Sequence, residues 1–283
     1  MLTRFLSSGF ALMVLAAFVF AISDITIKYL TSSLPIMEIS FIRFFLGGII
    51  LWPALSYQRI SLKGNRLRFL ILRGIVGTLS FLCMLKSMAL IPLSLTMVLF
   101  YTFPIFVAFI SSLWLGERIG RKELVLIAIG LIGIYFLIRP SSHTFNQGYL
   151  YGLLASLLGA MAMVMIRKAR ETNGAMIIYF YFCMVGGAMS FPFFLYNFKW
   201  PDPEQGGLLL FLGLLLLVAQ VMMNQAFKYC KAAEGSLLLM SEVVFTGIAG
   251  ILLFKDPVTV HFWGGALLVV GCGFGLNWVN RRA

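Results

Sequence analysis

The chain has 283 residues, of which 61% are hydrophobic and only 11% are charged. A soluble globular domain carries about 25% charged residues, so this composition excludes a water-soluble exterior. The net charge of +12 does not indicate a nucleic-acid partner, because the basic residues lie in short gaps between apolar runs. Composition therefore predicts a protein that is embedded in a lipid bilayer.

Apolar runs of about 20 residues, long enough to cross a ~30 Å hydrocarbon core as helices, recur along the whole chain. The first follows Arg4 and is interpreted as a retained span, because it is too long for a typical signal core and lacks a clean small-residue cleavage site. The predicted spans cover about Ser8 to Leu30, Pro35 to Leu55, Phe69 to Met88, Leu93 to Leu115, Glu123 to Ile138, Gly148 to Ile166, Gly174 to Tyr196, Gly207 to Phe227, Ala232 to Phe254 and His261 to Val279.

A polar segment after Arg139-Pro140 divides the ten predicted spans into two sets of five. The predicted fold is an all-α polytopic membrane protein with one five-helix repeat in residues 1–140 and a second in residues 141–283. Glu117 and Asp256, which follow the fourth and ninth spans, lie 139 residues apart, as do Lys28 and Arg167. Because five is an odd number, the second repeat enters the membrane from the opposite side, which is the inverted repeat of secondary transporters.

Charge in the connections predicts the orientation. One set of alternate connections holds 15 Lys and Arg residues and the opposite set holds 5. Cytoplasmic loops retain positive charge, so both termini are expected in the cytoplasm and the protein in a bacterial inner membrane.

Several features together resemble the drug/metabolite transporter superfamily, and within it the ten-helix transporters of EamA type. They are Lys28 at the end of the first span, the segment from Pro35 to Arg43, Pro104, and Gly116-Glu117. The second half departs from the family pattern, with Asp256 where Glu is usual and Glu242-Val243 where a proline is expected by analogy with Pro104.

The resemblance implies a secondary transporter that moves small organic metabolites by alternating access, with export of amino acids or related compounds as the leading hypothesis. Uptake or exchange of a larger, nucleoside-type cofactor similar to S-adenosylmethionine is the alternative, and a non-transporting assembly subunit is the hypothesis from a different class. An intramembrane enzyme is not expected, because no Ser or Cys is placed with a His at membrane depth.

No cofactor or metal site is expected. The four Cys residues are scattered singly in apolar runs, and the two His residues are isolated. No phosphate-binding loop is present, so the energy for transport is expected to come from gradients or from a partner, with protons as a candidate coupling ion. We expect a monomer or a weak homodimer.

Ionisable side chains inside a bilayer are expensive and indicate candidate site residues. Asp24 and Lys28 share a face of the first span, and Arg43 lies at a comparable depth in the second. These three residues form either a salt-bridge cluster that fixes the two helices or an outer gate and charge site for substrate.

Glu242 lies near the middle of the ninth span, beside Ser241, with no opposite charge within one turn. A carboxyl group there can bind a proton or a cationic group, or it is a structural acid that faces a neighbouring helix.

Pro104 removes one helix hydrogen bond near Phe100, which predicts either a polar notch that includes Tyr101 and Thr102 or a kink that only improves packing. Gln220 and Asn224, one turn apart on the eighth span, either line the same cavity or bridge helices.

Glu117 and Asp256 occupy equivalent turns on opposite faces of the predicted repeat. They are expected to brace two helix pairs as gating hairpins, whereas the simpler interpretation of Glu117 is a solvated cytoplasmic turn.

Overall fold

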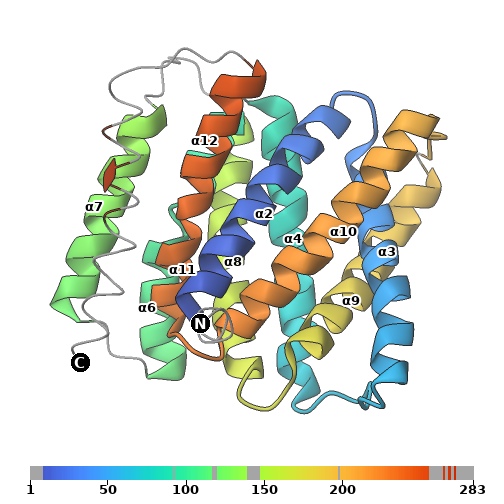
Figure 1. Ribbon diagram of the computed structural model, residues 1–283, viewed down its shortest axis with the longest axis horizontal. Coiled ribbons are helices and arrows are strands. Elements are labelled where there is room, and N and C mark those ends of the chain that lie inside the picture. Colours follow the sequence, from blue (N-terminus) through green and yellow to red (C-terminus); the bar gives the residue numbers. More distant parts are fainter. Residues whose placement is uncertain are drawn as a thin grey trace.

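The computed structural model describes residues 9–91, 93–116, 120–138, 147–196 and 198–254, together with Gly264, Leu267, Leu268 and Gly271. Regular secondary structure in these residues is helical (Figure 1). The helices are α2 (Gly9–Leu30), α3 (Ile36–Tyr57), α4 (Leu67–Leu90), α5 (Leu93–Phe100), α6 (Phe103–Leu115), α7 (Arg121–Ile138), α8 (Gln147–Ala169), α9 (Ala175–Tyr196), α10 (Pro203–Ala226), α11 (Ala232–Leu239) and α12 (Ser241–Phe254).

Seven segments of the described chain are long and apolar enough to cross a membrane, and shorter apolar helices accompany them. The protein is therefore a polytopic, all-helical membrane protein. The observed helices begin and end within a few residues of the first nine predicted spans. Nearly all of the tenth predicted span lies outside the described residues.

Two of the predicted spans are each divided into two helices. The fourth consists of α5 and α6, separated at Tyr101 and Thr102, and the ninth consists of α11 and α12, separated at Met240. The same hydrogen bond closes both breaks: Thr102 Oγ1 donates to Leu99 O at 2.7 Å, and Ser241 Oγ donates to Leu238 O at 2.7 Å. These donors and acceptors are 139 residues apart in sequence, so the two breaks are in register.

A second pair of hydrogen bonds shows the same offset. Lys28 Nζ, at the end of α2, donates to Met88 O in the last turn of α4 at 2.7 Å. Arg167 Nη1, near the end of α8, donates to Phe227 O just after α10 at 3.1 Å. Each cation therefore satisfies a carbonyl at a helix C-terminus, where no intrahelical donor is available.

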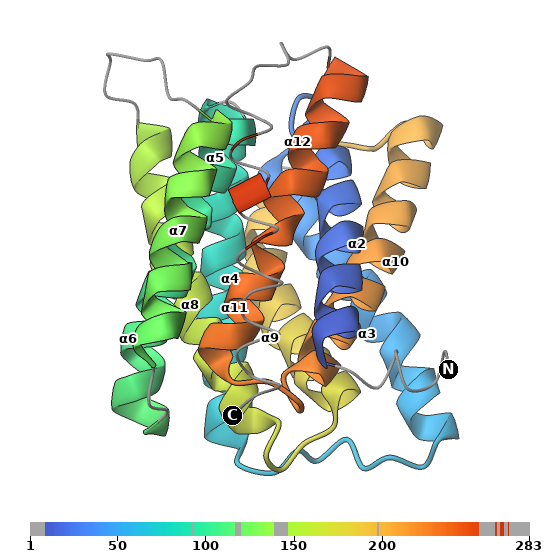
Figure 2. The same cartoon turned by 60° about the vertical axis from the view of Figure 1, so that its left-hand side comes forward.

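Helix pairs across the two halves are also matched. The helix α4 packs along α8, and α2 packs along α10 (Figures 1 and 2). The 139-residue offset relates α4 to α10 and α2 to α8, so the second contact repeats the first with the two halves exchanged. The helices α3 and α9, which exchange with each other, form a further extensive contact. Glycine permits this approach, because a Cβ at Gly186 would lie 2.5 Å from the ring of Phe44.

The connections α3–α4 and α8–α9 lie at the lower end of the molecule in Figure 1, which we call the basic end because Lys and Arg gather in these connections. They are joined there by two hydrogen bonds between Asn65 and Asn173 and by an ion pair between Arg66 and Glu171 at 3.3 Å. At the opposite end, the backbone N–H of Lys199 donates to Glu38 Oε2 at 3.1 Å. Polar contacts thus join the two halves at both ends.

Candidate functional site

A cavity lies beside the breaks of the two broken helices, away from both ends of the long helices. It is lined from α2, α3, α4, α8, α9 and α10, and from residues at or beside the two breaks. Its volume is about 100 Å³, measured as the space open to the centre of a water molecule. That space holds several water molecules, so this conformation is narrow compared with a site for a large metabolite.

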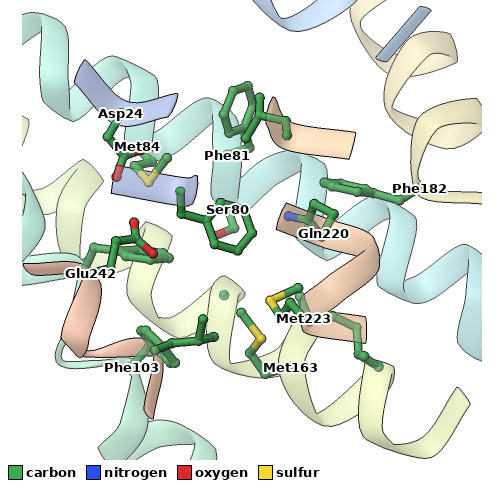
Figure 3. Close-up of a pocket in the computed structure, with 18 of the residues that line it drawn as sticks. Asp24, Ser80, Phe81, Met84, Phe103, Met163, Phe182, Gln220, Met223 and Glu242 are labelled. Carbon is green, nitrogen blue, oxygen red and sulfur yellow. The ribbon is translucent and has the colours of Figure 1, made fainter. Parts of the chain in front are cut away.

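An acidic group forms one side of the cavity. The carboxyl groups of Asp24 on α2 and Glu242 on α12 interact with each other, and Glu242 also interacts with the hydroxyl of Tyr101. Figure 3 shows Asp24 and Glu242 together on one side of the pocket. All three residues are buried. An ionised carboxylate only accepts hydrogen bonds, so a proton held at this pair would allow the two groups to share a hydrogen bond.

Two arginines form the other side. The guanidinium carbon of Arg43 lies 3.6 Å from the ring centroid of Phe81, and that of Arg73 lies 3.6 Å from the ring centroid of Phe182. Nη2 of Arg73 donates to Gln220 Oε1 at 2.9 Å. Phe182 and Gln220 lie on the side of the pocket away from Glu242 in Figure 3. Stacking on aromatic faces stabilises a cation where water is excluded.

These arginines keep unpaired donors. Nε and Nη2 of Arg43, and Nε and Nη1 of Arg73, are buried and have no hydrogen-bond partner within the part of the chain that the structure describes. Oδ2 of Asp24 on the acidic side also lacks a partner there. Buried polar atoms are nearly always hydrogen-bonded in native proteins, so these three lining residues hold an unusual concentration of unsatisfied polar atoms.

The cavity lining follows the same 139-residue offset as the helix breaks. Nine pairs of lining residues are related by it: Phe20 and Gly159, Asp24 and Met163, Ile27 and Ile166, Arg43 and Phe182, Gly77 and Leu216, Phe81 and Gln220, Met84 and Met223, Phe100 and Leu239, and Phe103 and Glu242. Equivalent positions of the two halves therefore face one common space. In each of the three pairs that contain an ionisable residue, the other member is apolar.

Six of the residues that the sequence singled out line this cavity: Asp24, Arg43, Phe100, Tyr101, Gln220 and Glu242. The notch proposed around Pro104 is thus partly formed, by Phe100 and Tyr101. Thr102 instead contacts Ser156 Oγ at 2.8 Å in addition to its bond within the break. Pro104 is buried in the first turn of α6.

The remaining candidates lie elsewhere. Asn224 Nδ2 donates to Ala175 O at 3.3 Å and so bridges α10 and α9, while Ser241 closes the α11–α12 break. Lys28 bonds to the end of α4, and no ion pair within the described residues joins Asp24 to Lys28 or Arg43. Glu117 and Asp256 lie outside the described residues.

Arg73 and Ser80 are the polar lining residues that sequence reasoning missed. Ser80 Oγ donates to Ala155 O at 2.7 Å. Arg73 had a usable signal, because an arginine inside an apolar span must face the protein interior, but nothing in the sequence placed it beside Arg43.

The sequence is similar to known transporters along nearly its whole length. The EamA-like transporter family matches it twice, over residues 7–139 and 146–277. The pseudopaline exporter CntI of Pseudomonas aeruginosa is 30% identical over 275 residues, covering 96% of this chain and 97% of the exporter. The S-adenosylmethionine uptake transporter of Rickettsia prowazekii is 26% identical over 254 residues, covering 88% of this chain and 85% of that protein.

A solved crystal structure has the same fold, with a TM-score of 0.78 and 17% sequence identity over 97% of this chain and 96% of the other. The named relatives are transporters of small metabolites and not enzymes. Because the family covers nearly all of the sequence and both matches fall within the chain, the protein belongs to the EamA-like transporter family, within the drug/metabolite transporter superfamily.

Proposed function

We propose that this protein is a secondary transporter that exports amino acids or related small metabolites across a bacterial inner membrane, with both termini in the cytoplasm. The observation that carries the proposal is the cavity beside the breaks of two broken helices, whose lining residues Asp24, Arg43 and Arg73 keep buried polar atoms without a partner in the described chain. Broken helices at mid-membrane and a site at the interface of two repeats are the usual construction of a secondary transporter.

The proposal divides the chain into inverted repeats of five helices, residues 1–140 and 141–283. The two family matches, the paired cavity lining and the two pairs of equivalent hydrogen bonds support this division. Two similar halves can exchange conformations, and that exchange opens a central site alternately to each side.

Alternating access requires the contacts at each end to break in turn. Opening toward the basic end separates Asn65 from Asn173 and Arg66 from Glu171. Opening toward the other end separates Lys199 from Glu38. Surface ion pairs such as Arg66–Glu171 are worth about 0–1 kcal/mol, so this pair contributes little to holding the basic end closed.

Protons are the proposed coupling ion, and the pair formed by Asp24 and Glu242 is the proposed coupling site. This pair is the only place in the described cavity wall where two carboxyl groups interact. A proton released there leaves two like charges in a confined space, and a cationic substrate group would relieve that repulsion.

The direct test is counterflow. Liposomes that contain only this protein and a high internal concentration of one unlabelled amino acid are placed in a trace of the same labelled compound, and the assay is repeated across the amino acids. Transient accumulation of label with at least one compound is expected. Its absence for amino acids, nucleosides and amines alike would favour a non-transporting assembly subunit.

Uptake of a nucleoside-type cofactor is the second candidate, favoured by the similarity to S-adenosylmethionine uptake transporters. It requires a larger site than the cavity seen here, and therefore a wider conformation. A thermal-shift comparison of S-adenosylmethionine with amino acids at one concentration separates the two candidates, because a ligand that binds the folded state more tightly raises the melting temperature further.

A further inference from the structure

We infer that the central cavity binds a zwitterion that carries two carboxylates and one amino group, with the carboxylates at Arg43 and Arg73 and the amine at Asp24 and Glu242. This inference rests on the proposed transport function and names the substrate class of that same site.

The arginine side is built to receive carboxylates. The guanidinium groups of Arg43 and Arg73 are both stacked against Phe182, at 5.3 and 3.6 Å from its ring centroid, so two positive charges lie close together. Four of their nitrogens are buried donors without a partner in the described chain. A guanidinium group presents a planar fork that matches a carboxylate, and two such forks match two carboxylates.

A purely structural role for Arg43 and Arg73 does not explain why four of their donor nitrogens have no partner in the described chain. The aromatic rings stabilise the positive charge, yet they accept no in-plane hydrogen bond from Nε or the free Nη atoms. Gln220 satisfies only Nη2 of Arg73. A purely structural arginine at this depth would be expected to hold a carboxylate of the protein, and the two carboxyl groups of the cavity bind each other instead.

The acidic side fits an amine. Asp24 and Glu242 present oxygens on one side of the space, and Oδ2 of Asp24 has no partner in the described chain. An ammonium group has three donors and no acceptor, which complements a pair of carboxyl groups and the oxygen of Tyr101. Phe182 and Gln220, which contact Arg73, lie on the side of the pocket away from Asp24 and Glu242, so the cavity is polarised along one direction (Figure 3).

The absence of a side chain at Gly77 leaves space for the guanidinium group of Arg73. A Cβ added at Gly77 would lie 2.0 Å from Nη1 of Arg73, one of the unpaired donors. The residue at this position therefore controls where the guanidinium group can lie.

Three compounds of matched length test the inference on the purified, lipid-reconstituted protein. L-Glutamate has the amine and both carboxylates, 4-aminobutyrate lacks one carboxylate, and glutarate lacks the amine. Calorimetric titration should show that L-glutamate binds roughly tenfold or more tightly than either of the others, because each omission leaves charged groups of the site unpaired. Equal affinity for all three, or binding of none, would overturn the inference.

Variants assign the two sides separately. Arg73→Lys keeps the charge and loses the fork, so it should remove the preference for L-glutamate over 4-aminobutyrate and retain the preference over glutarate. Glu242→Gln should remove the preference for L-glutamate over glutarate and retain the preference over 4-aminobutyrate. Arg68→Lys and Glu204→Gln, on exposed positions outside the cavity, are the matched controls. A uniform loss of affinity for all three compounds in both cavity variants would show a merely structural role.

Gly77→Ala provides a test that leaves every charged residue in place. It should lower L-glutamate affinity at least fivefold with little change in melting temperature, because the long side chain of Arg73 can move away. Gly187→Ala, whose Cβ would meet its nearest atom at 3.9 Å, is the control. Unchanged affinity in Gly77→Ala would contradict the assigned position of the carboxylates. Counterflow of an uncharged compound that binds more tightly than L-glutamate would leave the transport function intact and overturn only the two-sided site.

Discussion

The two broken helices have the same backbone and different chemistry. Both α5–α6 and α11–α12 break at the same register position, and the same side-chain hydrogen bond to a carbonyl three residues earlier closes each break. Yet the first break is followed by Phe103-Pro104 and the second by Glu242-Val243. Symmetry of the backbone thus coexists with asymmetry of the side chains that face the cavity.

The same contrast holds around the whole cavity. Where the first half has Asp24 and Arg43, the second has Met163 and Phe182, and where the second has Glu242 the first has Phe103. In the proposed mechanism, a symmetric frame allows the two halves to exchange conformations. If the proposed substrate binds in this cavity, asymmetric charges give it one orientation, which a symmetric lining could not do.

The largest effect on transport is expected from replacing Glu242, the acid whose equivalent in the first half is Phe103. Glu242→Gln should abolish the pH dependence of transport in proteoliposomes and leave the yield of folded protein intact, because the amide cannot exchange a proton. Transport is measured as initial rate at several external pH values. Glu204→Gln, on an exposed position, is the control. A pH profile that stays unchanged in Glu242→Gln would exclude this residue as the coupling site.

The equivalent tethers at the helix ends test the symmetry of the frame. Lys28→Met removes the bond to Met88 O, and Arg167→Met removes the bond to Phe227 O. Each variant should lower the free energy of unfolding by about 1–2 kcal/mol, since a partly exposed charged donor lies at the lower end of the range for such bonds. Melting temperatures in matched detergent measure the change. A loss confined to one of the two variants would contradict their equivalence.

The side chains that close the two breaks should differ slightly in how much they contribute to the free energy of unfolding. Ser241→Ala removes one bond and is expected to lower stability by about 0.5–1 kcal/mol. Thr102→Ala also removes the contact with Ser156 and should lower it by about 1–1.5 kcal/mol. Thermal denaturation of the two variants in parallel checks the order. The reverse order would show that the contact with Ser156 contributes little.

Replacing Pro104 should have the smallest effect on stability and transport. The second break forms with Val243 at the equivalent position, and Pro104 lies in the first turn of α6, where the missing N–H has no intrahelical acceptor. Pro104→Ala is therefore expected to change stability by less than about 1 kcal/mol and to retain transport. Loss of transport in a well-folded Pro104→Ala protein would show that the proline, and not the surrounding frame, maintains the break.

Much of the fold could be predicted from the sequence because the bilayer restricts the possible structures. Apolar runs of about 20 residues must be helices there, and nine predicted spans coincide with observed helices to within a few residues. The break at Pro104 also had a local signal. The break at Met240 had none within its apolar run, and only the register with the first half reveals it.

The site could be predicted only in part. The sequence shows that a charged residue is buried in an apolar span, but it does not show which residue that charge contacts. Asp24, Arg43 and Glu242 were identified as costly residues, yet Asp24 interacts with Glu242, 218 residues away, rather than with its helix neighbour Lys28. Arg73 faces the same cavity as Arg43 through the packing of α3, α4 and α9. Such pairings depend on helix rotation, which apolar runs do not specify.

The central claim is that one cavity opens alternately to the two sides of the membrane. Ser80, a buried lining residue, reports on it directly. In a Ser80→Cys variant from which Cys83, Cys183, Cys230 and Cys272 have been removed, a membrane-impermeant thiol reagent should label the protein in both right-side-out and inside-out vesicles, and bound substrate should slow labelling in both. Labelling from one side only, with and without substrate, would contradict alternating access.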